Sequence, residues 1–446
     1  MIDIKFLESE IRDQYLANDD NRPWIIGFSG GKDSTMLLQL VWSALSKIEM
    51  AKAYQRAIYV VCNNTLVENP KIINFTERTL NRIESAALKQ SLPISVVRTT
   101  PKLEDTFWLN LIGKGYPTPS SIFRWCTDRL KISPTTKFIL DKINDSGEVI
   151  ILLGTRSDES SNRAKSMKQR EIFGKRLRKH VLPNAYVYAP LKDVVTDEVW
   201  QYLLQNPPLW GGTNRELVTL YRNATGGDCP LVIDTTTPSC GNSRFGCWVC
   251  TVVQKDKSMQ ALIDNGEEWM LPLLELRNYL AETQTNHEKY RQKERRNGTI
   301  TEGVHGPYFP SVRAKILEDL LKAQKEIREE DPNMVLISQQ ELIAIQIIWY
   351  RDGIFYPRVS DIYNKVYNIN SLDMDKQDNQ RQKEDALLHQ VCHRNPDDVQ
   401  LINNLLDLHK SKILLKNRNG LKGDLEKELD FFLKKKKIET VASQYS

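Results

Sequence analysis

The chain has 446 residues, of which 40% are hydrophobic and 27% are charged, and its 62 basic against 57 acidic side chains leave a net charge of +5. This length suits two or three domains with a substantial core, and the composition excludes wholesale disorder and a fibrous repeat. The apolar runs fall far short of the roughly 18 residues that a membrane-spanning helix needs, and the N-terminal segment lacks the apolar core of a signal peptide, so we expect a cytoplasmic protein with no membrane partner.

Short apolar strands alternate with longer helical stretches over the first part of the chain. After an amphipathic helix over residues 1–20, the pattern predicts strands at Trp24–Phe28, Ala57–Cys62, Ile94–Arg98 and Val149–Gly154, helices at 33–47 and 70–90, and a helical, Pro-interrupted stretch at 103–145. Strands that are apolar throughout and separated by helices form a parallel sheet covered on both faces. Ligands of such sheets bind at the carboxyl ends of the strands, so we expect the site in the loops that follow them.

The later part of the chain changes in character. Tyr188–Leu191 is a short apolar stretch, and Asp197–Gln205 begins a helix with an acidic first turn. The next 50 residues are rich in Pro, Gly and Cys and show little periodicity, so we expect them to need a cross-link, such as a bound metal, to stay ordered. We therefore divide the chain into an N-terminal helix (1–22), an α/β domain (23–205), a Cys-rich segment (206–256) and a charged, mainly helical C-terminal region (257–446).

The sharpest local signal is the sequence SGGKDS at Ser29–Ser34, directly after the first strand. Its two glycines let the backbone approach an anion closely, and N–H groups at the start of the following helix point toward that anion. Lys32 adds a positive charge. The Walker A motif does not fit, because Asp33 follows the lysine where that motif has Ser or Thr. An ordinary glycine turn capped by a serine is the alternative.

This loop resembles the pyrophosphate-binding loop of the PP-loop ATP pyrophosphatase family, whose members cleave ATP between the α and β phosphates. Three later segments resemble the phosphoadenosine-phosphosulfate (PAPS) reductase-like branch: FRWCTDRLKISP at Phe123–Pro134, GTRSDESSNR at Gly154–Arg163 and PLKDVVTDEVWQYL at Pro190–Leu203. Four motifs in this order are more specific than any one of them. The resemblance implies a parallel, twisted α/β sheet with helices on both faces, of the adenine nucleotide alpha hydrolase type.

The same resemblance implies an ATP site. Arg156 and Arg163 follow a strand, where guanidinium groups can pair with phosphate oxygens, and Glu159 could orient Arg156 or hold Mg²⁺. Lys131 and Arg129 could neutralise charge at the α-phosphate. A surface ion pair is the alternative for each arginine. The expected ATP-binding residues are Ser29, Gly30, Gly31, Lys32, Asp33, Ser34, Thr65, Glu68, Arg156, Glu159 and Arg163, and the expected catalytic residues are Lys32, Asp33, Cys126, Lys131 and Arg156.

One stretch departs from the family pattern. After the second strand the family commonly has Asp-Thr-Gly-x-Glu, whereas this chain has Asn64-Thr65-Leu66-Val67-Glu68. Thr65 and Glu68 match, but Asn64 stands in place of the acid and Leu66 in place of the glycine. Any role of that acid, and the way the adenosine or the acceptor is held, are therefore open.

Four of the seven cysteines lie within 22 residues: Cys229, Cys240, Cys247 and Cys250. Four thiolates suit zinc and a [4Fe–4S] cluster equally. Some sulfur-handling members of the family carry such clusters, which favours iron, with zinc as the alternative. In neighbouring adenylylsulfate reductases a cysteine in the segment of Cys126 helps to bind the cluster, so Cys126 could replace Cys229. Otherwise Cys126 could carry a persulfide, or be a small buried residue.

A basic run follows the Arg156 motif. Asn162–His180 holds eight Lys and Arg side chains against one acid. A solvated helix face is the usual interpretation of such a run, but its position next to the expected ATP site also suits the backbone of DNA. The candidate DNA contacts are Lys168, Lys175, Arg176 and Lys179.

The long extension beyond the Cys-rich segment, with no cysteine after Cys392, is unlike a sulfate reductase. The chain instead resembles the DndC family of DNA phosphorothioation (DNA sulfur modification) proteins, which belong to bacterial restriction–modification systems. This resemblance implies an ATP pyrophosphatase and sulfurtransferase that adenylates a DNA phosphate and then replaces AMP with sulfur. It implies DNA, a cysteine desulfurase and the other phosphorothioation proteins as partners. The alternatives are a tRNA thiolase, a phosphosulfate reductase, and a non-enzymatic, nucleotide-sensing DNA-binding protein stapled by zinc.

Overall fold

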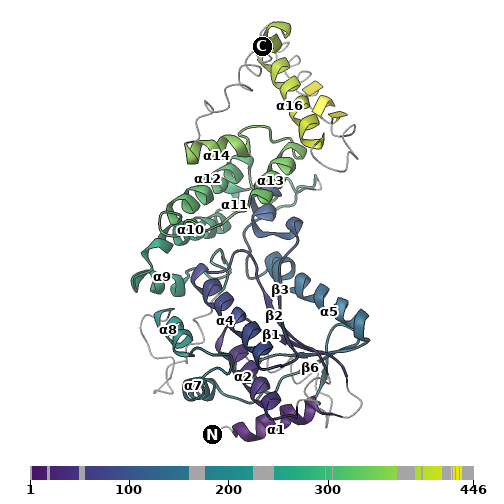
Figure 1. Ribbon diagram of the computed structural model, residues 1–446. Helices are drawn as coiled ribbons and strands as arrows, with labels where there is room; N and C mark the ends of the chain where they lie inside the picture. The colour runs from purple at the N-terminus through teal and green to yellow at the C-terminus, as the bar shows by residue number, and fades with distance from the viewer. Residues whose placement is uncertain are drawn as a thin grey trace. The chain divides into compact units, whose positions relative to one another are not determined.

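The computed structural model (Figure 1) describes residues 3–17, 21–49, 56–159, 176–224, 246–296, 298–303, 305–368, 387–392 and 395–413, and single residues between 423 and 433. The chain forms two compact units. The first comprises Met1–Phe107 and Thr118–Gln284, and the second comprises Trp108–Pro117 and Thr285–Ser446. Within the described ranges, every helix is too short or too polar to cross a membrane.

A six-stranded sheet forms the centre of the first unit, with strand order β3-β2-β1-β4-β6-β5. The strands are β1 (Trp24–Gly27), β2 (Ile58–Asn63), β3 (Ile94–Thr99), β4 (Val149–Leu152), β5 (Arg178–Lys179) and β6 (Ala185–Tyr188). All neighbouring strands pair in parallel except β5 and β6, which are antiparallel. In the central register Ile26 lies between Val60 and Leu152. The parallel α/β sheet predicted from the apolar strands is therefore confirmed.

Helices cover both faces of this sheet (Figure 1). The first unit contains α1 (Ile4–Tyr15), α2 (Lys32–Ser46), α4 (Pro70–Lys89), α5 (Ser133–Ser146), α7 (Thr196–Gln205), α8 (Arg215–Ala224), α9 (Lys257–Asp264) and α10 (Leu271–Thr285). Side chains alternate between the two faces of a strand. Trp24 and Ile26 of β1 therefore join the core formed with α1, α2, α4, α7 and α8, whereas Ile25 packs on the opposite face with Ile139 of α5.

The connection from β3 to α5 contains three short helical turns rather than one long helix. They are η1 (Leu103–Asp105) and the π-helices η2 (Leu109–Gly113) and η3 (Thr127–Ile132). η3 continues directly into α5, which has Pro134 in its first turn, a position where a missing N–H costs little. The Pro-interrupted helical stretch expected here is therefore divided between the two units, since η2 belongs to the second one.

The second unit is helical and is built around the segment Trp108–Pro117. Its helices are α11 (His287–Tyr290), α12 (Pro310–Ile327), α13 (Gln339–Arg351), α14 (Val359–Tyr367) and α16 (Pro396–Ile413). The buried Arg313 of α12 donates hydrogen bonds to the carbonyls of Ile112, at 2.8 Å, and Gly113. The indole of Trp349 also donates to Ile112, at 2.8 Å. These bonds satisfy buried carbonyls that would otherwise be costly.

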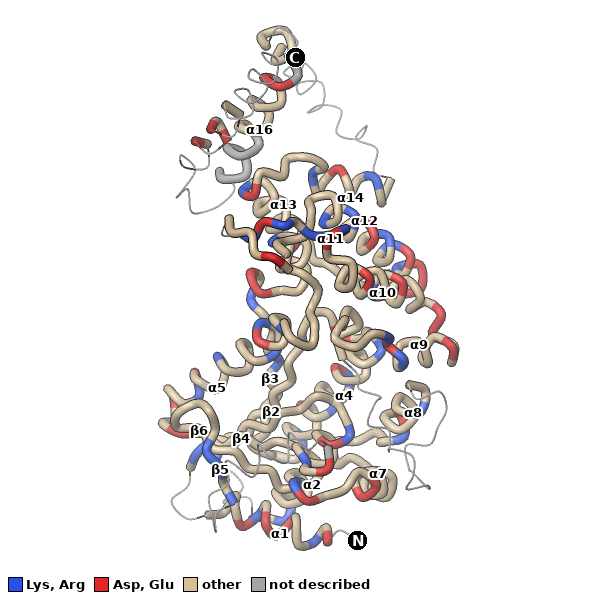
Figure 2. The backbone as a smooth tube through the Cα atoms, turned by 180° about the vertical axis from the view of Figure 1, so that it is seen from behind, with Lys and Arg blue, Asp and Glu red and all other residues tan. Residues whose placement is uncertain are grey.

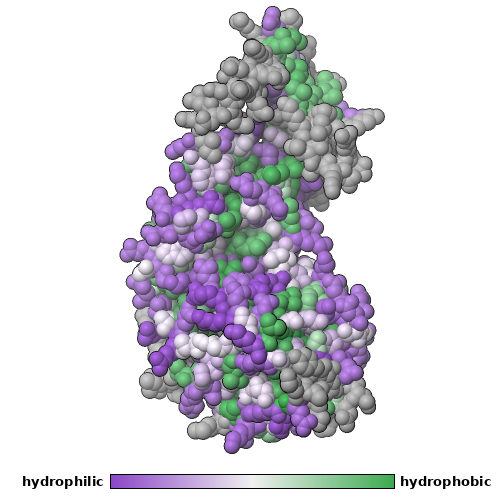
Figure 3. Space-filling model, viewed as in Figure 1, coloured by the Kyte–Doolittle hydropathy of each residue, from purple (hydrophilic) through white to green (hydrophobic). Residues whose placement is uncertain are grey.

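Polar side chains predominate on the surface seen in Figure 3, as expected when the helices turn their apolar faces inward. Within the second unit, for example, Ile316, Leu317 and Leu320 of α12 are fully buried. The mainly helical C-terminal region predicted from the sequence is confirmed.

Candidate functional site

The loop between β1 and α2 folds tightly on itself. Gly30 has a φ of +72°, and a Cβ at this position would lie 2.5 Å from the hydroxyl oxygen of Thr76 on α4, so a larger residue does not fit. The Ser34 hydroxyl accepts from the backbone N–H of Ser29, at 3.3 Å, and donates to the carbonyl of Gly31, at 3.0 Å. The loop is therefore shaped before any ligand arrives.

The first turn of α2 offers positive charge to a ligand. Its N-cap is Gly31, which has no side chain to occupy the N–H groups of the first turn, and such groups bind phosphate well. The Lys32 ammonium lies 3.2 Å from the carboxylate of Asp33 and 5.7 Å from the ring centroid of Tyr221 on α8. Tyr221 in turn packs edge-on against Trp200, with centroids 4.9 Å apart. Lys32 is thus held beside the loop by a carboxylate and an aromatic ring.

Arg156 lies beneath this loop and is 1% exposed. Its Nε donates to Asp33 Oδ1 at 2.7 Å, and its Nη atoms donate to the carbonyl of Val194 at 3.1 Å and the hydroxyl of Thr196 at 3.0 Å. Asp158 is a further partner, at 3.4 Å. All of these contacts are to protein groups, and through them Arg156 holds the carboxylate of Asp33 in position. Direct pairing of Arg156 with phosphate, expected from the sequence, stays a prediction.

The Cys247–Cys250 turn packs against the loop that follows β2. The backbone of Cys247 forms an antiparallel bridge with Glu68, and the N–H of Trp248 donates to the carbonyl of Val67 at 3.0 Å. The sulfur of Cys247 lies 3.4 Å from the Thr65 hydroxyl. Residues nearly 180 positions apart therefore meet at the carboxyl end of β2, which pairs with β1.

Lys131, on η3, lies among the acidic groups of this cluster. The pKa of Lys131 is raised by Cys247 most strongly, and also by Glu68, Cys126 and Cys250. Burial raises the pKa of Cys247 to about 11 and also raises the pKa of Glu68 and of Cys126, while Lys131 opposes each of these shifts. Lys131 is therefore charged, whereas the raised pKa values of Cys126 and Cys247 favour their neutral thiols.

η3 is fixed to the sheet by Asn63 at the end of β2. The Asn63 amide donates to the carbonyl of Leu130 at 2.8 Å and accepts from the Thr99 hydroxyl at 3.0 Å. Lys131, the next residue along η3, is held at the carboxyl edge of the sheet for this reason.

The departure from the family pattern after β2 has a structural explanation. Leu66 has a φ of +65°, the left-handed conformation that usually selects glycine. The Asn64 side chain accepts a hydrogen bond from the N–H of Leu66 at 2.8 Å, which forms an Asx turn. Asn64 thus stabilises the turn conformation, a different role from that of a catalytic acid.

A buried arginine binds the main-chain carbonyls at the end of the cysteine turn and just beyond it. Arg277 of α10 is 0% exposed. It donates to the carbonyls of Cys250 at 3.0 Å and Gln254 at 2.7 Å, and also to that of Val253. Sequence reasoning missed this residue, because a single arginine in a charged helical region carries no distinguishing signal. Thr76 of α4 and Tyr221 of α8 were also missed, because neither residue belongs to a recognisable motif.

The described residues supply part of a metal site. Among them, no group of three or more His, Cys, Asp or Glu side chains is arranged to hold a metal ion. Cys247 and Cys250 form no disulfide, and two thiols on one tight turn suit one corner of a four-cysteine site. Cys229 and Cys240, expected to complete it, lie outside the described residues.

Other predicted residues are placed as follows. Glu159 ends the short turn η4 (Ser157–Glu159), but its side chain lies outside the described residues, as do Arg163, Lys168 and Lys175. Arg176 forms ion pairs with Glu10 and Asp13 of α1. Lys179 is exposed on β5, a basic strand that Figure 2 shows near α1. Of the four candidate DNA contacts, Arg176 therefore already has acidic partners.

A glycine-rich loop between the first strand of a parallel sheet and the following helix, with free N–H groups at the start of that helix, defines an α/β nucleotide-binding fold of the PP-loop type. The chain belongs to the family of the phosphoadenosine phosphosulfate reductase domain, whose model matches residues 23–253. Members of this family are enzymes. The family predicted from the motifs is thereby confirmed.

Individual relatives are more distant. An uncharacterized protein of Methanocaldococcus jannaschii is 30% identical over 185 residues, which are 41% of this chain and 32% of that protein. The chain thus matches about a third of that curated relative's length. Among solved structures, PAPS reductase from Candida auris is 12% identical, with a TM-score of 0.28 over 46% of this chain and 85% of that one. The U34-tRNA thiolase NcsA from Methanococcus maripaludis, solved with its [4Fe-4S] cluster, is 13% identical, with a TM-score of 0.29 over 64% and 80%.

Proposed function

We propose that this protein is an ATP pyrophosphatase that adenylates a DNA backbone phosphate and then replaces AMP with sulfur, giving a phosphorothioate. One observation carries the proposal: the Cys247–Cys250 turn packs against Thr65 and Glu68 at the carboxyl end of β2, next to the strand that carries the Ser29–Ser34 loop. Neighbouring strands are only about 5 Å apart. An anion-binding loop and a group of thiols at one sheet edge suit adenylation followed by sulfur transfer.

In the first step, ATP binds with its β and γ phosphates on the loop, where Lys32 and the first N–H groups of α2 face them. Asp33, held by Arg156, and Glu159 would hold Mg²⁺, which neutralises charge on the pyrophosphate. An oxygen of the DNA phosphate attacks the α-phosphorus, the bond to the β-phosphate breaks, and pyrophosphate leaves. Lys131 stabilises the negative charge that develops at the α-phosphate.

In the second step, the terminal sulfur of a persulfide on Cys126 attacks the activated DNA phosphorus and AMP leaves. The phosphorus is then joined to Cys126 through a disulfide, which two equivalents of a thiol reductant cleave to release the phosphorothioate and the Cys126 thiol. A cysteine desulfurase supplies the persulfide sulfur, and the other phosphorothioation proteins act with it. Cys247 and Cys250, with Cys229 and Cys240 or with Cys126 in place of Cys229, would hold a [4Fe–4S] cluster or zinc. Such a cluster would supply iron that binds sulfur.

The deciding experiment is mass spectrometry of digested DNA and RNA from the native host with and without this gene. Phosphorothioate dinucleotides that depend on the gene would support the proposal. Loss of a thiolated RNA nucleoside would identify a tRNA thiolase instead. If neither changes, sulfur transfer to nucleic acid is refuted, and reduction of a phosphosulfate would be tested next.

ATP turnover separates an enzyme from a nucleotide-sensing DNA-binding protein. We expect pyrophosphate release that is lost in Lys32→Ala and Asp33→Ala, because both residues belong to the loop. Release of orthophosphate, or no turnover with DNA and a sulfur donor present, would contradict the enzymatic proposal. Iron content after oxygen-free purification distinguishes a cluster from zinc.

A further inference from the structure

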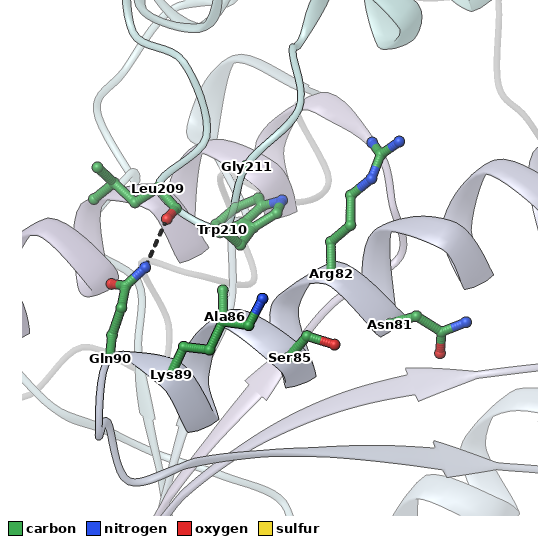
Figure 4. A pocket seen from close by; sticks show the side chains of 9 residues that line it. All are labelled: Asn81, Arg82, Ser85, Ala86, Lys89, Gln90, Leu209, Trp210 and Gly211. Carbon is green, nitrogen blue, oxygen red and sulfur yellow. Dashed lines mark hydrogen bonds between the residues drawn. The ribbon is translucent and has the colours of Figure 1, made fainter.

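An open hollow lies on the first unit, between α4 and the loop over residues 207–213 that follows α7 (Figure 4). It has a volume of about 530 Å³. Arg82 and Lys89 are its charged lining residues, and the lining contains no acidic residue. At 1.5 Å per residue, Arg82 lies about 18 Å along α4 from Pro70, where the helix begins beside Glu68 and the cysteine turn. The hollow is therefore distinct from the candidate site.

The charges of Arg82 and Lys89 have no acidic partner in the part of the chain that the structure describes. The nearby acids Glu77 and Glu84 pair with Arg98, at 2.8 and 3.9 Å, while Arg82 and Lys89 form no ion pair or hydrogen bond with a described residue. Seven residues separate them, which is two helical turns or about 10 Å along one face. In Figure 4 the Arg82 side chain rises from α4, and the Lys89 side chain runs along the helix past Ala86.

Hydrogen bonds from side-chain amides, the buried Gln39 and Asn214 and the exposed Gln90, fix the loop over the hollow. Gln39 donates to the carbonyl of Asn206 at 3.1 Å and accepts from Asn214 at 3.0 Å. Gln90 donates to the carbonyl of Leu209 at 3.0 Å. Buried polar networks of this kind hold one geometry when their groups are satisfied. The hollow is therefore preformed, which lowers the entropic cost of binding a ligand.

Two glycines keep the hollow open. Gly211 and Gly212 have φ values of +90° and +84°. A Cβ on Gly212 would lie 2.7 Å from Nη1 of Arg82, whereas a Cβ on Gly211 would meet no atom within 4 Å. The Arg82 guanidinium therefore lies against the loop backbone, at the rim of the hollow.

We propose that this hollow binds phosphate groups, with a nucleic-acid backbone as the source. Guanidinium groups form paired hydrogen bonds with phosphate oxygens, and lysine adds a point charge. Two cationic side chains and no acidic one in the lining suit the repeated negative charges of a nucleic-acid backbone. The choice of DNA as the polymer rests on the proposed function, whereas the phosphate chemistry does not.

The test measures the affinity of the full-length protein for a fluorescein-labelled 20-base-pair duplex over a series of salt concentrations. Each phosphate contact contributes about 0.9 to the slope of log K against log salt. In a protein carrying both Arg82→Gln and Lys89→Gln, we therefore expect this slope to fall by about 1.8, with ATP affinity unchanged. Binding of inorganic pyrophosphate, measured by calorimetry in a Lys32→Ala background, tests for a free phosphate ligand.

A matched pair of glycine variants separates the hollow from a general charge effect. Gly212→Ala displaces the Arg82 guanidinium and should weaken duplex binding, whereas Gly211→Ala carries a similar backbone strain and should not. Loss of pyrophosphate binding alone would keep the phosphate site but overturn a nucleic-acid ligand. Unchanged binding of both probes in the Arg82 and Lys89 double variant would overturn the proposal, whether or not the host DNA contains phosphorothioates.

Discussion

Substitution of Arg277 by leucine should loosen the Cys247–Cys250 turn without unfolding the chain. The change keeps the apolar packing of α10 but leaves the carbonyls of Cys250, Val253 and Gln254 without their donor. Cys250 is half-buried, whereas Val253 and Gln254 are exposed, so water can replace the lost donor at two of the three carbonyls. An acceptor that loses its partner away from water costs about 1–3 kcal/mol. Because every 1.4 kcal/mol is a factor of ten, the turn should open about tenfold more often.

The assay is the rate at which iodoacetamide modifies each cysteine in the folded protein, followed by mass spectrometry of peptides. We expect Cys247 and Cys250 to react about tenfold faster in Arg277→Leu, with Cys62 and Cys392, both buried, as internal references.

Arg313→Leu is the matched control, because Arg313 is a second buried arginine that binds main-chain carbonyls, those of Ile112 and Gly113. It should destabilise the second unit by a similar amount and leave the cysteine rates unchanged. Equal rates in the Arg277 variant and the wild-type protein, or equal acceleration in both variants, would refute the reasoning.

Four further outcomes are expected. Gly30→Ala should weaken ATP binding at least tenfold in a titration, because the new Cβ meets the Thr76 hydroxyl at 2.5 Å, and a second change, Thr76→Ala, should restore part of it. Arg156→Lys, which keeps the charge but cannot span its four partners, should lower pyrophosphate release at least tenfold at saturating ATP while the circular dichroism spectrum stays native. Leu66→Gly should raise the free energy of unfolding by about 0.5–1 kcal/mol in urea, because it relieves a left-handed φ of +65° at an exposed side chain. Burial raises the pKa of Tyr15 from 10.0 to about 12. The neutral Tyr15 hydroxyl therefore contributes fully to stability below pH 10, and this contribution is lost as the pH rises through 12. In Tyr15→Phe, the free energy of unfolding should fall between pH 10 and 12 by about 1.4 kcal/mol per pH unit less than in the wild-type protein.

The sequence predicted those parts of the fold whose signals are local. An apolar run predicts β1, and the glycines and lysine after it predict an anion loop, because these residues act within a few positions of one another. The apolar stretch Tyr188–Leu191, by contrast, overlaps β6 only at Tyr188. Pairing with β4 and β5 selects Ala185–Tyr188 for the strand, while Leu191 is buried in the core beyond its end.

Features that depend on distant partners could not be predicted in this way. Arg156 follows a strand, as phosphate-binding arginines do, but its hydrogen bonds to Val194 and Thr196 come from residues about 40 positions later. Arg277 and Arg313 bind carbonyls that have no side-chain signature at all. Local motifs therefore identify the chemistry of the candidate site. The hydrogen-bond partners of its arginines depend on long-range contacts that the sequence does not show.

The segment Trp108–Pro117 has a consequence for how this protein is made. Its apolar side chains leave the ribosome early, but α12, which covers them, follows only about 190 residues later, a delay of about 10–40 s at ordinary rates of synthesis. During that interval the apolar side chains of this segment have no partner from α12. Newly made chains should therefore bind chaperones at this segment, and the protein should reach its working form only after translation has passed α13.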